Sequence, residues 1–253
     1  MQPTVVINEK VAQKVLEVVD CGLTSGLGTP KPGHMCVEAA VCYALELPHG
    51  DDPSCVSSAL RSLKIRLNDS RWSSDKTRAS GLRKLALCQL GSEGFLDDAK
   101  FTEKVALMTV RQLLPRILRR AGFFEQAKTC EEAGNLKEAR AAAAYATAAA
   151  AYATAAATAA AAAYATAAAA DAAAAYATAA AAAAAAYVAA ADADAAADAA
   201  AAAAYATAAA ADAAAAYATA ADAELSFFAD QVVQILIEMN APGCQWLYLC
   251  DKE

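Results

Sequence analysis

The stretch AAAAYATAAAAYATAAATAAAAAYATAAAA at residues 141–170 decides the fold class of this chain of 253 residues. Alanine has the highest intrinsic helix propensity, and the interval between Gly134 and Pro242 contains neither glycine nor proline. A single uninterrupted helix across that interval would be about 160 Å long at ~1.5 Å per residue. The sequence therefore predicts an all-α protein, in which the tract is either one rod or several helices.

Tyrosines supply the large side chains of the tract, and their spacing argues against one straight helix. They lie at positions 145, 152, 164, 176, 187, 205 and 217. A step of 12 residues, as between Tyr152 and Tyr164, turns a side chain by about 120° at ~100° per residue, so one helix would point its tyrosines in several directions. Because aspartate can cap a new helix, we expect residues 141–224 to form a stack of short, closely packed Ala-rich helices.

The segments on either side of the tract have ordinary composition and predict further helices. Capping signals occur at Asn8, at Asp52-Pro53 and in the run Ser73-Ser74-Asp75, each before an amphipathic segment. The Gly- and Pro-rich residues 22–33 predict a loop, and Pro115 predicts a kink in a helix over residues 97–118. We expect residues 1–140 to form a helical N-terminal bundle, and residues 225–253 to form a closing helix followed by a short arm.

The net charge of -7 is unevenly distributed along the sequence. Residues 141–223 contain six aspartates and no lysine or arginine, whereas 21 basic and 22 acidic residues nearly cancel elsewhere. This balance argues against a general nucleic-acid binder, and the aspartates argue against a membrane span. With no secretory signal evident and eight scattered cysteines lacking a CxxC pair, we expect a cytoplasmic protein with mostly buried free thiols.

The densest cluster of reactive residue types consists of His34, Cys36, Glu38, Cys42, His49 and Cys55. The cluster lacks the short pairs that normally fix a tetrahedral metal ion, so we predict no metal and no cofactor. A metal ion could be held only if the fold brought together His34, Cys36, His49 and Cys55. Cys36 could instead be a nucleophile served by His49, although no glycine-rich oxyanion loop is evident.

A basic run with an aromatic residue provides the predicted binding residues, which are Arg61, Lys64, Arg66, Arg71, Trp72 and Arg78. Such a run can bind phosphate groups and stack on a ligand. It can equally be a solvated helix face, or it can neutralise the aspartates of the tract. We expect any nucleic-acid binding to be weak and strongly dependent on salt.

Three sequence blocks resemble a family of uncharacterised bacterial and phage proteins that join such an N-terminal block to Ala/Tyr-rich repeats. The blocks are GHMCVEA at residues 33–39, DDPSCV at residues 51–56 and IRLND at residues 65–69. The chain is also distantly similar, mainly in composition, to immunity-protein-like domains of polymorphic toxin systems. These resemblances imply no activity and no functional residues.

Taken together, these patterns favour a non-catalytic binding or assembly protein, since no coherent catalytic constellation accompanies the rigid Ala/Tyr scaffold. The expected partner is another protein, immunity-like in its mode of action, or a second copy of the chain. The alternative is a cysteine- or metal-dependent enzyme that uses the region of His34, Cys36, His49 and Cys55.

Overall fold

The computed structural model describes residues 6–120, 122–139, 141–146 and 218–251. All regular elements within these ranges are helices, and the prediction of an all-α fold is confirmed. A single isolated β-bridge joins Gly28 to Met35 within the described part. Residues 147–217 of the predicted stack of short Ala-rich helices, with the tyrosines from Tyr152 to Tyr217, lie outside the described residues.

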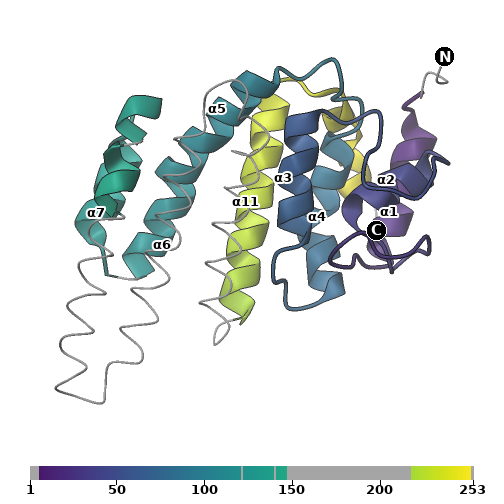
Figure 1. The fold of residues 1–253 in the computed structure, drawn as a ribbon, viewed down its shortest axis with the longest axis horizontal. Coiled ribbons are helices and arrows are strands. Elements are labelled where there is room, and N and C mark those ends of the chain that lie inside the picture. Colours follow the sequence, from purple (N-terminus) through teal and green to yellow (C-terminus); the bar gives the residue numbers. More distant parts are fainter. Residues whose placement is uncertain (1–5, 121, 140, 147–217, 252–253) are drawn as a thin grey trace.

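The described helices stand side by side in a broad row (Figure 1). From one end of the row to the other they are α7 (Phe124–Glu132), the continuous α5 (Asp98–Met108), η1 (Thr109–Leu113) and α6 (Leu114–Arg120), then α11 (Ala218–Glu238), α3 (Ser58–Asn68) with α4 (Asp75–Cys88), and finally α2 (Val37–Ala44) with α1 (Glu9–Asp20). The last long helix of the chain, α11, therefore lies between helices of the N-terminal half.

Side-chain caps begin two helices where the sequence predicts them. The Asn8 side chain accepts a hydrogen bond from Val11 N at 3.1 Å and begins α1. Within the predicted run of residues 73–75, the Ser74 hydroxyl accepts one from Thr77 N at 3.1 Å and begins α4. Both predictions are confirmed, because a cap needs only groups within three residues of itself.

The predicted start of the next helix at Asp52-Pro53 is wrong. Helix α3 begins at Ser58, and Ser57 is its N-cap. Val56 N donates to Pro53 O within a turn, so the proline belongs to the connection before the helix. Ser57 N donates to Ser92 Oγ at 2.9 Å. This bond to a distant residue fixes Ser57 as the end of the connection, and no local pattern encodes it.

Pro115 interrupts the long α5–α6 helix as predicted, through a π-helical turn. In η1 the Leu114 N–H bonds to Thr109 O, five residues earlier instead of four. Proline lacks an N–H and its ring crowds the carbonyl of the preceding turn, so an extra residue in that turn relieves the conflict. Such π turns occur frequently at functional sites.

The closing helix and the terminal arm are both present. Helix α11 buries Leu225, Phe228, Val232 and Leu236 and packs mainly against α4. After Pro242 the chain continues as the 3-10 helix η4 (Pro242–Asp251), which packs against α4 and α1. Within the described residues, α11 already includes the seven positions before the predicted boundary at residue 225. Within the described ranges, no helix combines the length and apolarity that crossing a membrane requires.

Candidate functional site

The three sequence blocks of the N-terminal half meet around the Gly- and Pro-rich loop that follows α1. The Asn68 side chain accepts from Val37 N at 3.2 Å and donates to Thr24 O at 2.9 Å. Its neighbour Asp69 accepts from Gly26 N at 2.7 Å. These bonds fasten the loop to the start of α2 and to the end of α3.

Gly28 occupies the narrowest point of this loop. Its φ of 71° lies in the left-handed region, and a Cβ atom added there would lie 2.1 Å from the carbonyl oxygen of His34. Thr29 N donates to that same oxygen at 2.7 Å, and His49 Nε2 lies 3.2 Å from Gly28 O. Both histidines are exposed on the outer side of the loop.

Glu38 and Lys64 form an ion pair that is completely buried beneath the loop. Lys64 Nζ lies 2.8 Å from Glu38 Oε1, and neither side chain has any exposed surface. Neither charged group has a well-oriented hydrogen bond to another described group. Burial raises the pKa of Glu38 and lowers that of Lys64, while the attraction between the two opposes both shifts.

The cysteines of the predicted cluster surround this ion pair as buried thiols. The Cys36 sulfur accepts from Ala39 N at 3.3 Å and caps α2. Burial raises the pKa of Cys36 and of Cys55, and it raises the pKa of Cys42 to about 12. All three thiols are therefore protonated at neutral pH, which is the unreactive form.

The predicted His/Cys group does not assemble into a metal site within the described ranges. No three His, Cys, Asp or Glu side chains there are grouped so that they could hold a metal ion. The cavity beside Glu38, lined also by Cys36 and Asn68, measures only about 30 Å³. That is roughly the volume of one water molecule. The described residues thus show no catalytic arrangement that would support the alternative, a cysteine- or metal-dependent enzyme using His34, Cys36, His49 and Cys55.

The six predicted binding residues do not share one exposed face. Lys64 is buried on Glu38, and the Trp72 ring is buried with its Nε1 donating to Leu67 O at 2.9 Å. Arg78 is also buried, where it donates to Asn68 O and to Leu23 O, both at 2.8 Å. These three side chains thus have structural partners.

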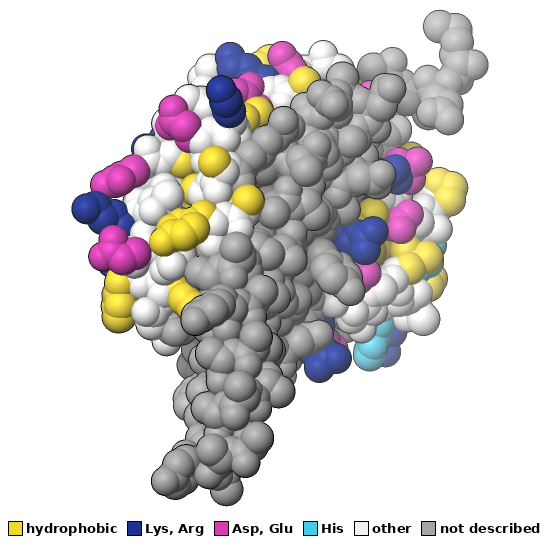
Figure 2. Space-filling model, turned by 60° about the vertical axis from the view of Figure 1, so that its left-hand side comes forward, with side chains coloured by type: hydrophobic (Ala, Val, Ile, Leu, Met, Phe, Trp, Pro, Cys, Tyr) yellow, Lys and Arg dark blue, Asp and Glu magenta, His cyan; other side chains and the backbone are white. Residues whose placement is uncertain are grey.

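The other three members of the basic run lie nearer the surface. Arg61 pairs with Asp52 at 2.8 Å, while Arg66 and Arg71 are exposed. On the face shown in Figure 2, basic and acidic side chains of the described residues are interspersed, with no block of one sign. Binding by this run stays a prediction, and it would have to use Arg61, Arg66 and Arg71.

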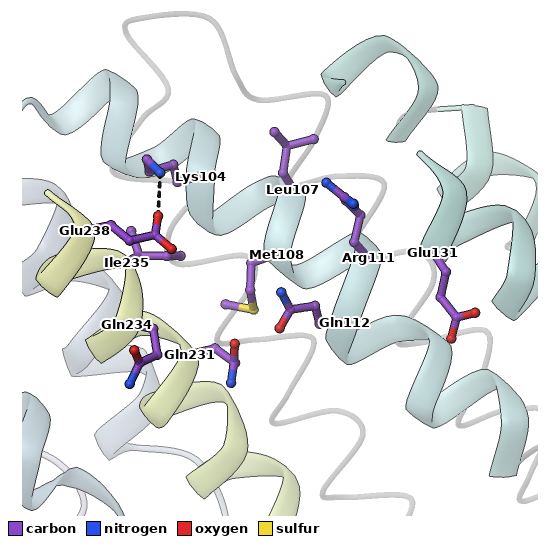
Figure 3. A pocket seen from close by; sticks show the side chains of 10 residues that line it. All are labelled: Lys104, Leu107, Met108, Arg111, Gln112, Glu131, Gln231, Gln234, Ile235 and Glu238. Carbon is purple, nitrogen blue, oxygen red and sulfur yellow. Dashed lines mark hydrogen bonds and ion pairs between the residues drawn. The ribbon is translucent and has the colours of Figure 1, made fainter. Parts of the chain in front are cut away.

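A larger opening lies between α5–η1, α11 and α7, and we call it the glutamine groove (Figure 3). It has a volume of about 340 Å³ and is lined by Lys104, Leu107, Met108, Arg111, Gln112, Glu131, Gln231, Gln234, Ile235 and Glu238. This volume falls within the range of about 300–1,000 Å³ that is typical of ligand sites.

Polar groups between two ion pairs distinguish the glutamine groove. The pair of Lys104 and Glu238, 2.7 Å apart, closes one end, and Glu131, paired with Arg119 on α6, marks the other. Between them, the Arg111 guanidinium and the amides of three glutamines make no hydrogen bond or ion pair with any described residue. These glutamines are Gln112, Gln231 and Gln234. Within the described part of the chain, the groove therefore offers several donors and acceptors without partners, together with apolar lining residues.

The sequence contains two weak signals for the glutamine groove. Pro115 predicts an irregular turn, which contains Arg111 and Gln112. Gln231 and Gln234 interrupt the apolar run of α11. Neither signal identifies a site alone, because the facing helices are separated by about a hundred residues.

The chain matches no protein-family model, no curated protein and no solved structure.

Proposed function

We propose that this protein is a non-catalytic binding module that holds an extended, acidic segment of a partner protein in the glutamine groove. The side chains of Arg111, Gln112, Gln231 and Gln234, which have no partner among the described residues, carry this proposal. Primary amides can donate to and accept from a peptide backbone, and a guanidinium binds a carboxylate through two parallel hydrogen bonds.

The apolar lining of the groove fits a peptide side chain. It consists of Leu107, Met108 and Ile235, and methionine adapts readily to different apolar partners. Mutual pairing of Lys104 with Glu238 leaves Arg111 as the cation available to a ligand in this groove. An acidic residue flanked by an apolar residue is therefore the expected recognition element.

This mode of action agrees with the immunity-like role expected from the sequence, in which a protein acts by binding another protein. We place the protein in the cytoplasm, where its thiols would stay reduced. The buried, protonated state of Cys36, Cys42 and Cys55 also favours binding over thiol catalysis at the predicted cluster.

A peptide-display selection on the immobilised full chain tests the proposal. We expect enrichment of peptides that carry Asp or Glu next to an apolar residue, and we expect Arg111→Ala to weaken their binding about tenfold, the equivalent of ~1.4 kcal/mol. Gln231→Ala should weaken it by a smaller factor. Fluorescence anisotropy with a labelled enriched peptide measures both effects.

Arg66→Ala is the matched control, since it removes an exposed arginine from α3, away from the groove. This variant should bind the peptide as the wild type does. Equal affinity of Arg111→Ala and wild type would overturn the proposal, and so would failure to enrich any acidic peptide. Enrichment of a segment of this chain itself would identify self-association as the function instead.

A further inference from the structure

The backbones of α4 and η4 touch at adjacent residues. A Cβ atom added to Gly243 would lie 2.2 Å from Leu87 O and 2.8 Å from the carbonyl carbon and oxygen of Cys88. Only glycine fits this approach. It brings the next residue, Cys244, against Cys88, although 155 residues separate the two along the chain (88 to 244).

These two cysteines form a hydrogen-bonded thiol pair. Cys88 is fully buried, and Cys244 is partly exposed. The interaction between the two thiols raises the pKa of Cys88 and lowers the pKa of Cys244. Cys244 therefore loses its proton first, which makes it the more nucleophilic sulfur of the pair.

Cys244 also lines an open pocket of about 550 Å³ at the junction of α11 and η4. The other lining residues are Ile237, Asn240, Ala241, Pro242, Gln245 and Leu247. None of these side chains is charged, so the described walls favour an uncharged ligand. A small molecule entering here can reach Cys244 but not the buried Cys88.

We propose that Cys244 and Cys88 form a redox-active dithiol that reduces a small, uncharged disulfide bound in this pocket. This activity goes beyond the proposed peptide binding and uses a separate part of the fold. It rests on the accessible thiol, the buried thiol bonded to it, and the pocket that leads to the first of them.

The reaction proceeds in two thiol–disulfide exchanges. The Cys244 thiolate attacks one sulfur of the disulfide RSSR, forms a mixed disulfide and releases the other half as a thiolate. Cys88 then gives its proton to that thiolate and attacks the Cys244 sulfur, which expels the second half as a thiolate. This second thiolate takes up the proton that Cys244 had released to solvent, and so it also leaves as RSH. The dithiol and RSSR thus become one protein disulfide and two RSH, and the two electrons come from the cysteines.

Two other partly or fully exposed cysteines provide internal references. Cys21 is exposed on α1's C-terminal side and hydrogen-bonds only to Glu17 O among the described groups, so it has no thiol partner. Cys250 is partly exposed, and burial raises its pKa. Neither is expected to yield an internal disulfide.

The test treats the reduced, full-length chain with 2-hydroxyethyl disulfide, blocks the remaining thiols and maps the peptides by mass spectrometry. The expected main product is a peptide pair linked through Cys88 and Cys244. In Cys88→Ala the mixed disulfide should accumulate on Cys244, and in Cys244→Ser the linked pair should be lost. Cys250→Ser is the matched control and should behave as the wild type.

Circular dichroism shows whether each variant has folded, and the mapping of the wild type does not depend on any variant. Reaction at Cys21 or Cys250 with Cys244 left free would overturn the proposal. It would also be overturned if the wild type retained a mixed disulfide on Cys244 without linkage, or if the linkage formed only in urea.

Discussion

Replacing Glu38 by glutamine should lower the free energy of unfolding by about 3–5 kcal/mol, the usual effect of removing one partner from a buried ion pair. Lys64 has no exposed surface, and its Nζ lies 2.8 Å from Glu38 Oε1. Among the described residues, no group makes a hydrogen bond that could replace the lost charge. At about 2–4 °C per kcal/mol, the melting temperature should fall by roughly 6–20 °C.

Urea unfolding followed by circular dichroism measures this change, and a double variant separates the pair from its surroundings. Glu38→Leu combined with Lys64→Met fills the same space without charge, so its stability should lie within about 1 kcal/mol of the wild type. Glu46→Gln is the matched control. Its pair with Lys14 is exposed, with 84% of the Glu46 side-chain surface accessible, and a loss of less than about 1 kcal/mol is expected.

The reasoning is refuted if Glu38→Gln costs no more than Glu46→Gln. It is refuted equally if the double variant loses the sum of the losses of Glu38→Leu alone and Lys64→Met alone, because additive effects would mean that the two charges do not interact. A strongly destabilised single variant rescued by the second substitution is the expected result.

Three further outcomes can be checked by unfolding experiments. The free energy of unfolding should fall as pH rises from 4.5, the ordinary pKa of glutamate, toward the raised pKa of Glu38. It should increase as pH rises from the lowered pKa of Lys64 toward 10.5, the ordinary pKa of lysine. Urea titrations of the uncharged double variant at several pH values should lack both slopes. Gly28→Ala, with its φ of 71° and the clash at His34 O, should lose about 2 kcal/mol by urea unfolding. Glu224→Gln, which weakens a buried carboxylate held by two arginines, should lose about 2 kcal/mol, and calorimetry should find the loss smaller at high salt.

Local signals in the sequence predicted much of the described fold. Asn8 and Ser74 begin helices because their side chains reach an N–H three residues on, and this geometry can be read from sequence alone. Asp52-Pro53 carries an equally good signal but lies before the helix, because Ser57 is fixed by Ser92. Capping patterns therefore indicate where a helix can begin, and tertiary bonds select among them.

The site residues were harder to predict, because charge patterns do not reveal distant partners. Lys64 and Arg78 lie in a run that resembles a solvated face, yet both are buried against groups more than 20 residues away along the chain. Arg111 and Gln231 meet in one groove only because α11 returns between helices of the N-terminal half. The basic run was visible in the sequence, whereas the buried partners of Lys64 and Arg78 were not.

The π-helical turn at Thr109–Leu113 also determines how one long helix serves two neighbours. An extra residue in a turn advances all later side chains by about 100° relative to those before it. The side chains of α5 can thus pack on α11 while those of α6 pack on α7. Deleting one residue from the turn would bring both halves into the same angular phase, and one of the two neighbouring helices would face the wrong side chains.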